Sequence, residues 1–171
     1  MTATTAMPAE TAIFHPEQRA DHGYFRLWGT RGSIPVSGPN YARHGGNTSC
    51  MEIGCGADRI IFDAGSGIRE LGLSVMAEPP HKVHLFITHT HWDHIQGFPF
   101  FLPSFVPGFA IDVYAPPNID TDIESIFRGQ LDRAYFPVQM EDMQAKFEFK
   151  VLGEETVQIG DVKIDWEYTL H

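Results

Sequence analysis

Residues 88–94 carry a dense set of side chains that bind metal ions. They read Thr-His-Thr-His-Trp-Asp-His, so three imidazoles and one carboxylate fall within six positions of a chain that has nine histidines. Imidazole nitrogen and carboxylate oxygen together are the ligand set of zinc, iron or manganese rather than of calcium. Four such groups crowded together without a metal would repel one another on protonation. We therefore predict a metal site formed by His89, His91, Asp93 and His94.

The preceding strand is expected to position these ligands. Residues 82–88 are nearly all apolar, which is typical of a strand covered on both faces. His89 and His91 are two residues apart at its end, so their side chains leave the same face and can converge on one ion. Asp93 and His94 follow where the backbone turns, toward a neighbouring second ion. The structural alternative is that Asp93 caps a short helix beginning near His94.

Strands and one helix are predicted before this motif. Apolar and aromatic patterns favour strands at residues 24–28, 51–53 and 59–62. The third strand runs into a glycine-rich turn at residues 63–67. After this turn Ile68, Leu71 and Val75 recur at helical spacing, and two prolines end the helix.

The sequence after the motif predicts a second helix and a β-rich end. Asn118 is expected to cap a helix whose apolar face consists of Ile119, Ile123, Ile126 and Phe127. Alternation predicts a strand at residues 146–151, and a turn at Gly160-Asp161 joins residues 157–159 to a last strand at 162–170. Interspersed helices and hairpins predict an α/β fold of mixed sheets covered by helices.

Composition indicates one ordinary globular domain. The chain has 171 residues, of which 43% are hydrophobic and 20% charged. Its apolar stretches are far shorter than the ~20 residues that span a bilayer, so no membrane segment is expected. Residues 1–22 lack the features of a secretory signal and are expected to be a flexible lead-in to a domain at 23–171. Cys50 and Cys55 are expected to be reduced thiols, which favours a cytoplasmic location.

The charge is strongly acidic and unevenly placed. The net charge is −10, and residues 112–171 hold thirteen acidic and five basic side chains. Such a surface repels a phosphate backbone, so nucleic acid is disfavoured as a partner. The acidic excess has a plainer explanation in solubility.

The metal-binding motif and several glycine-rich segments resemble a known superfamily. The pattern HxHxDH at His89, His91, Asp93 and His94 is the signature of the metallo-β-lactamase fold superfamily, and residues 62–67 resemble its Asp-x-Gly turn. Residues 28–35, 45–50 and 94–99 look like the branch that contains tRNase Z and the cyclic-phosphate phosphodiesterases. The resemblance spans about residues 24–171. It implies an αββα sandwich with a binuclear metal site at the edge of two facing sheets.

The resemblance also implies roles for individual residues. His89 and His91 would bind one metal, Asp93 and His94 the second, and His171 resembles a later histidine that completes the first site. The family's bridging aspartate and final histidine have no counterpart within the 171 residues, so the chain is expected to hold the N-terminal half of the domain.

Three further residues are candidates for supporting roles. Asp63 would support the ligands from the turn beside the motif, with a simple turn former as the alternative. Arg31 and Asn47 lie in loops that the resemblance places near the site, where they would contact a phosphate. Their alternatives are a solvated loop arginine and a turn former.

The function that follows is hydrolysis of a small phosphodiester, with a cyclic nucleotide as one candidate. Two divalent ions, Zn²⁺ first and Mn²⁺ or Fe as alternatives, would lower the pKa of a bound water toward ~7 and supply hydroxide. Asp93 would both ligate a metal and orient the attacking water. The acidic charge and the lack of a basic insertion between residues 110 and 145 argue against tRNA processing.

Other interpretations stay open. Thioester hydrolysis and a di-iron redox centre are alternatives on the same fold, and an inactive metal-binding half-domain is another. A half-sandwich would expose an apolar sheet, so association with a missing C-terminal half or with another copy is expected.

Overall fold

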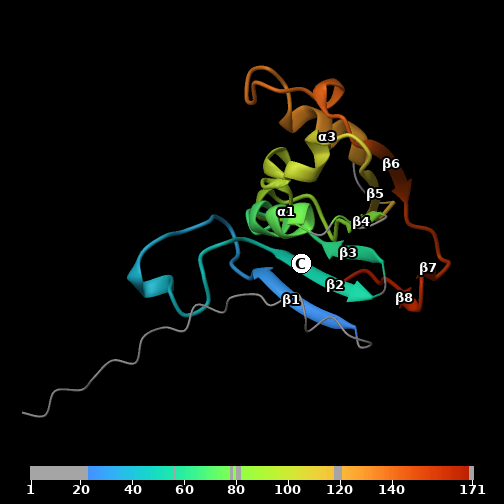
Figure 1. The fold of residues 1–171 in the computed structure, drawn as a ribbon, viewed down its shortest axis with the longest axis horizontal. Coiled ribbons are helices and arrows are strands. Elements are labelled where there is room, and N and C mark those ends of the chain that lie inside the picture. The colour runs from blue at the N-terminus through green and yellow to red at the C-terminus, as the bar shows by residue number, and fades with distance from the viewer. Residues whose placement is uncertain (1–22, 56, 78, 80–81, 118–120, 170–171) are drawn as a thin grey trace, which may run out of the picture.

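The computed structural model describes residues 23–55, 57–77, 79, 82–117 and 121–169. Its centre is a six-stranded sheet in which the strands lie in sequence order (Figure 1). The strands are β1 Tyr24–Gly29, β2 Cys50–Cys55, β3 Asp58–Phe62, β4 Val83–Phe86, β5 Ala110–Ala115 and β6 Lys146–Val151. The pairs β1·β2 and β2·β3 are antiparallel, whereas β3 to β6 run parallel to one another. The carboxyl ends of these four parallel strands therefore share one edge of the sheet.

Two helices cover one face of this sheet. They are α1, Ile68–Ala77, and α3, Ile123–Gln130, and they lie on the same side of the sheet in Figure 1. Leu85, Ile111 and Val113 of the central strands are fully buried beneath this layer. Phe98, from the segment after the metal-binding motif, packs edge to face on Phe127 of α3 at 4.3 Å between ring centroids.

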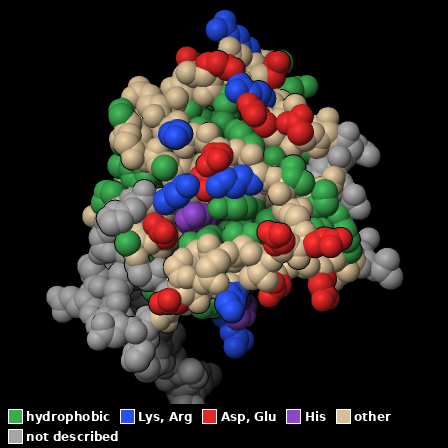
Figure 2. All heavy atoms as spheres, turned by 90° about the vertical axis from the view of Figure 1, so that its right-hand side faces the viewer, with side chains coloured by type: hydrophobic (Ala, Val, Ile, Leu, Met, Phe, Trp, Pro, Cys, Tyr) green, Lys and Arg blue, Asp and Glu red, His purple; other side chains and the backbone are tan. Residues whose placement is uncertain are grey.

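The opposite face of the sheet carries a smaller core. A hairpin of β7, Val157–Ile159, and β8, Val162–Ile164, packs its buried isoleucines against Ile60, Phe86 and Tyr114. On the same face of β1, Phe25 and Leu27 remain 60% and 55% exposed. Charged side chains of both signs also gather on this face around a histidine, over a band of hydrophobic residues (Figure 2).

This charged group centres on a buried carboxylate. Asp112 of β5 is 2% exposed and accepts hydrogen bonds from Lys82 Nζ at 2.7 Å, from Lys150 Nζ and from the Tyr114 hydroxyl. Burial alone would raise the pKa of Asp112, but the hydrogen bonds and charges of the two lysines outweigh it and lower the pKa. The ionised carboxylate is thus compensated inside the protein.

Most predicted elements are confirmed. The three strands before the motif, the helix after the glycine-rich turn, the strand at residues 146–151 and the hairpin at Gly160-Asp161 all form. These elements build a mixed α/β architecture, which confirms the predicted fold class. Within the described ranges, no helix is both long and apolar enough to cross a membrane. The predicted lead-in, residues 1–22, lies outside the described residues.

Three predictions about element bounds were wrong. The second helix begins at Ile123 because Asp122 accepts the Ser125 N–H at 2.8 Å as its cap, and Asn118 lies outside the described residues. The last strand ends at Ile164 rather than extending to residue 170, and just beyond it the Trp166 indole donates to the Gly153 carbonyl at 2.7 Å. Strand β4 ends at Phe86 rather than at Thr88: the Ile87 N–H still donates to the Tyr114 carbonyl at 2.8 Å, but the Thr88 N–H bonds the Asp63 side chain instead of the sheet.

One central strand was not predicted from the sequence. Strand β5 contains Asp112 in the middle of an otherwise apolar segment, which interrupts the pattern of a covered strand. The two lysine partners that make this aspartate tolerable come from residue 82, before β4, and from β6. They are far from it in sequence.

Candidate metal centre

The site lies at the shared edge of the sheet, where β3 and β4 end side by side. Asp63 directly follows β3 and its backbone N–H donates to the Phe86 carbonyl of β4 at 2.8 Å. Its Oδ1 accepts from the Thr88 N–H and the Thr88 hydroxyl, each at 2.9 Å. Asp63 has a left-handed backbone with φ 64°, which aspartate adopts more readily than most residues. The turn after β3 is thus joined to the first residues of the motif.

A second set of backbone contacts fixes the helical part of the motif. The short helix α2, Trp92–Ile95, carries Asp93 and His94. The Ala64 N–H donates to the His94 carbonyl at 2.7 Å, and the Gly97 N–H donates to the Ala64 carbonyl at 2.8 Å. A Cβ on Gly65 would lie 2.3 Å from the Asp93 carbonyl oxygen, so only glycine permits this approach.

The four motif side chains form two pairs of facing polar atoms. His89 Nε2 lies 3.1 Å from His91 Nδ1. His94 Nε2 lies 3.6 Å from Asp93 Oδ2. The rings of His89 and His94 have centroids 4.0 Å apart, so the two pairs are neighbours. The assignment of each pair to its own metal ion, which the sequence resemblance implied, stays a prediction.

Asp63 orients the imidazole of His94. Asp63 Oδ2 lies 2.7 Å from His94 Nδ1, and because an ionised carboxylate only accepts, Nδ1 carries the proton. In the neutral ring, which is the form that binds a metal, the unprotonated nitrogen is then Nε2, which faces Asp93. A histidine that gives one N–H to a carboxylate and turns its other nitrogen to a metal is the common arrangement of metal-binding imidazoles.

Thr88 orients the imidazole of His89 in the same way. Its hydroxyl proton is used on the Asp63 carboxylate, so its oxygen is left to accept from His89 Nδ1 at 3.1 Å. The unprotonated Nε2 of His89 then faces His91. Ser49 adds a further donor to Asp63 Oδ2 at 3.0 Å. Asp63 therefore sets both imidazoles, one directly and one through Thr88.

The electrostatics of the second pair favour opposite charges. The hydrogen bond to Asp63 raises the pKa of His94, although partial burial opposes this. Burial would raise the pKa of Asp93, but the hydrogen bond from the Ser33 backbone N–H and the neighbouring His94 and His89 lower it. Helix α2 has His91 at its N-cap, and the Asp93 side chain bonds Ser33, so Asp93 does not play the capping role that was its structural alternative.

The donor set fits a divalent metal, although the described residues supply only part of a site. Zinc–nitrogen bonds of ~2.0–2.1 Å place two tetrahedral ligands about 3.4 Å apart, close to the 3.1 and 3.6 Å separations of the two pairs. Among the residues that the structure describes, no group of three or more His, Cys, Asp or Glu side chains could hold a metal ion. His171, predicted to complete the first pair, lies outside them.

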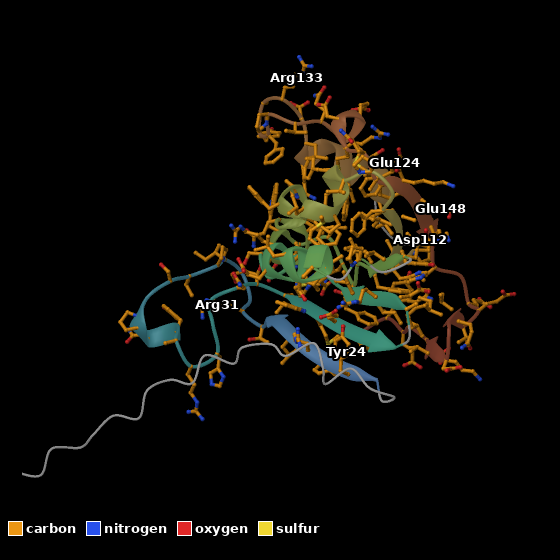
Figure 3. The ribbon with its side chains drawn as sticks, in the orientation of Figure 1. Tyr24, Arg31, Asp112, Glu124, Arg133 and Glu148 are labelled. Carbon is orange, nitrogen blue, oxygen red and sulfur yellow. The ribbon has the colours of Figure 1, made fainter. Side chains whose placement is uncertain are left out.

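Arg31 and Asn47 organise the loop between β1 and β2. The Arg31 guanidinium stacks on the Tyr41 ring at 4.8 Å within the loop that extends from the sheet (Figure 3). The Asn47 carbonyl accepts from the N–H groups of Thr30 and Arg31, and its side chain accepts from the Ser66 hydroxyl at 3.1 Å. The Arg31 Nε is buried, so this side chain is not the solvated arginine of the structural alternative. A phosphate-binding role for either residue stays a prediction.

Comparison with known proteins places the chain in a family. The family described as beta-lactamase superfamily domain matches residues 58–166, well over half of the chain. The chain belongs to the beta-lactamase superfamily. The matched residues include the glycine-rich turn and the HxHxDH motif, so the resemblance inferred from the sequence is confirmed.

Curated relatives in the superfamily are nucleases. Ribonuclease Z of Methanococcus aeolicus is 27% identical over 132 residues, which cover 74% of this chain and 38% of that protein. Ribonuclease BN of Salmonella paratyphi C is 31% identical over 88 residues, which cover 50% of this chain and 29% of that protein. The chain thus spans less than two fifths of the length of these relatives.

Solved structures agree in fold. The metallo-beta-lactamase fold protein YhfI from Bacillus subtilis superposes with a TM-score of 0.58 at 19% identity, over 88% of this chain and 55% of that one. A diphosphatase from the PhnP family gives 0.55 at 16% identity, over 84% of this chain and 56% of that one. At these identities the likeness concerns the fold alone.

The sequence did not predict the contacts of three residues with Asp63 or Asp93. Thr88 and Ser49 donate to Asp63, and Ser33 donates its backbone N–H to Asp93 Oδ2 at 2.8 Å. Thr88 had a signal, because a hydroxyl next to a ligand histidine can set its tautomer. Ser33 is 60 positions from its partner and carries no local signal of this contact.

Proposed function

We propose that the chain carries the metal-binding part of a metal-dependent phosphodiesterase that acts on a small phosphodiester. The observation that supports this proposal is the pair of imidazoles at His89 and His94, each held with its Nε2 facing a second ligand atom. When bound, divalent ions at these atoms would lower the pKa of a water molecule and stabilise charge on a phosphoryl oxygen.

The residues of the chain prepare the site for this chemistry. His89 and His91 would hold one ion, and Asp93 and His94 the other. Asp63 keeps a proton on His94 Nδ1, so this ring can bind only through Nε2. The lowered pKa of Asp93 keeps its carboxylate ionised, so it can accept a hydrogen bond from an attacking water and orient it.

A small substrate, rather than RNA, is favoured by charge. The net charge is −10, and an acidic surface repels a long phosphate backbone. The curated relatives are named ribonucleases, which favours a second candidate, the cleavage of RNA, and a tRNA precursor is the substrate that tests it. A cyclic nucleotide and a tRNA precursor, offered separately at physiological salt, distinguish the two functions. Turnover of the precursor alone would replace the first proposal by the second.

The direct assay uses bis(p-nitrophenyl) phosphate with added Zn²⁺ or Mn²⁺. The wild-type chain is expected to release p-nitrophenolate at least about 100-fold faster than His89→Ala, because removal of one ligand disrupts the ion site. His44→Ala, which changes an exposed histidine of the β1–β2 loop, is the matched control and should keep the wild-type rate. Equal rates for wild type and His89→Ala would end the proposal.

The same preparation separates the remaining alternatives. Stoichiometric iron with a visible charge-transfer band would favour a di-iron redox centre, and turnover of a thioester in place of the phosphodiester would favour a thioesterase. Metal binding with no turnover of any of these substrates would leave a metal-binding half-domain and refute catalysis by this chain.

A further inference from the structure

Two non-glycine residues of the described chain have a left-handed backbone, and both bind a side chain of the candidate site. Asp63 has φ 64° and contacts His94, and Ser33 has φ 73° and contacts Asp93. A left-handed conformation costs an L-residue roughly 1–2 kcal/mol, and it persists only where its surroundings impose it. The strain at Ser33 has no explanation in the metal-binding motif itself, because Ser33 lies in the loop between β1 and β2.

Local hydrogen bonds hold Ser33 in this conformation. The Ile34 N–H donates to the Gly32 carbonyl at 3.1 Å, which makes Ser33 the central residue of a strained γ-turn. The turn lies between two fixed points of the loop, since Arg31 N donates to the Asn47 carbonyl and Val36 N to the Gly46 carbonyl. From this turn the Ser33 N–H reaches Asp93, which lies outside the loop.

This N–H meets the ligand atom of Asp93. It donates to Asp93 Oδ2 at 2.8 Å, the same oxygen that lies 3.6 Å from His94 Nε2. A carboxylate oxygen has two lone pairs, so one can accept this N–H while the other stays available to an ion. The contact also favours one orientation of the carboxylate about its last bond.

We propose that the backbone N–H of Ser33 is a positioning group for Asp93, which fixes the carboxylate oxygen that pairs with His94 for metal binding. The inference rests on the proposed metal-dependent function. It assigns a role to the loop between β1 and β2. This loop contacts the site through a main-chain N–H rather than through the side chain of Arg31. Because the serine side chain itself is exposed, the role depends on backbone geometry and not on the hydroxyl.

The test separates backbone geometry from general stability with three variants. Ser33→Val puts a β-branched residue at φ 73°, which it adopts poorly, and is expected to move the N–H away from Asp93. Gly45→Val puts the same residue at φ 75° in the same loop, where an added Cβ meets nothing within 4 Å; because it replaces a glycine, its backbone strain is at least as large. Ser33→Gly keeps the N–H and removes the strain.

Zn²⁺ titration of the full chain, followed by NMR at the ring nitrogens of His94 and His89, gives the readout. Ser33→Val is expected to weaken the Zn²⁺ response of His94 by about 10–100-fold, the range for loss of a partner behind a ligand, with little change at His89. Ser33→Gly should match wild type within about twofold. Gly45→Val should lose at least as much stability to urea as Ser33→Val and keep the wild-type Zn²⁺ response at His94.

The inference would be overturned if the Zn²⁺ response of His94 is weakened equally in Ser33→Val and Gly45→Val, or if it is not weakened in Ser33→Val. If Ser33→Val does not fold, Ser33→Thr and Gly45→Thr place a different β-branched residue at the same two positions, and the same outcomes decide. If Zn²⁺ changes the NMR signals of neither His89 nor His94 in the wild-type chain, the proposed function would be overturned instead.

Discussion

Asp63 is the residue on which the geometry of the site depends most. One carboxylate receives hydrogen bonds from Thr88, Ser49 and His94 and thereby orients two imidazoles that lie in different pairs. Its side chain is only 6% exposed, so a missing partner cannot be replaced easily by solvent. A sequence pattern predicted that Asp63 supports the ligands. It did not predict that Asp63 orients His89 through Thr88, because this effect depends on the direction of the Thr88 hydroxyl proton.

Asp63→Asn tests this role. Asparagine tolerates the left-handed backbone but replaces one acceptor oxygen by a donor, so His94 or Thr88 loses its partner. The expected results are a free energy of unfolding lower by about 1–3 kcal/mol and a 10–100-fold weaker affinity for Zn²⁺. Urea denaturation and Zn²⁺ titration measure the two effects. Asp165→Asn, whose carboxylate bonds the Thr156 hydroxyl, is the control and should leave Zn²⁺ affinity unchanged.

The pH dependence of the metal-free chain tests the His94–Asp63 contact. The pKa of His94 is raised above its usual 6.5, so the folded state holds this proton more tightly than the unfolded state. The resulting stabilisation is complete below about pH 6.5 and is lost as the pH rises through the folded-state pKa. Urea denaturation from pH 5.5 upward should show this loss in the wild type and not in His94→Gln. Parallel curves for the two proteins would contradict the assignment.

At the scale of elements, the site depends on the close approach of two turns. The turn after β3 and the segment after α2 touch through backbone atoms at Gly65 and Gly97. The sequence predicted the glycine-rich turn and the helix after it from local spacing. It could not predict that these glycines face the motif, because the contact joins segments about thirty residues apart.

Gly97→Ala tests this approach. The new Cβ would lie 2.1 Å from the Gly65 carbonyl oxygen, which requires the two turns to separate. A loss of more than about 2 kcal/mol in the free energy of unfolding is expected, together with weaker Zn²⁺ binding. Gly129→Ala in α3 is the control, since its Cβ meets nothing within 4 Å and alanine favours helix by about 0.5–1 kcal/mol. A neutral Gly97→Ala would show that the turns are not tightly packed.

At the scale of the whole molecule, the two faces of the sheet differ in chemistry. The helix-covered face combines the larger apolar core with the buried Glu52–Arg59 ion pair. The other face combines a small core with the Asp112 cluster and the exposed Phe25 and Leu27. Association of this face with another segment or another copy stays a prediction. Static light scattering of the 171-residue chain over a range of concentrations tests it, and a monodisperse monomer at every concentration would contradict it.

Asp112→Asn tests the contribution of the buried charge to stability. Its lowered pKa means that stabilisation is present above the usual value of about 3.8 and is lost as the pH falls through the folded-state pKa. At pH 7 the variant should be less stable by about 1–3 kcal/mol, because Lys82 and Lys150 lose their shared carboxylate and are only partly exposed. The difference in stability between the variant and the wild type should disappear in acid. A difference that is unchanged at pH 2 would contradict this account.

The sequence predicted the elements that have strong local patterns. It failed where contacts with residues distant in the sequence determine whether an element forms or where it begins. Strand β5 was missed because Asp112 is compensated by Lys82, which precedes β4, and by Lys150 of β6, and the start of α3 shifted because Asp122 provides the cap. The ligand motif was recognisable because its residues are contiguous. The contacts from Asp63 and Ser33 required the fold to bring distant turns together.

The central claim is that His89, His91, Asp93 and His94 bind divalent metal. Equilibrium dialysis of the chelator-treated chain against Zn²⁺ tests it most directly, with the double variant His89→Ala/His94→Ala for comparison and His44→Ala as the control. The account predicts that wild type and His44→Ala bind Zn²⁺ at least about tenfold more tightly than the double variant. Equal binding by all three proteins would contradict it.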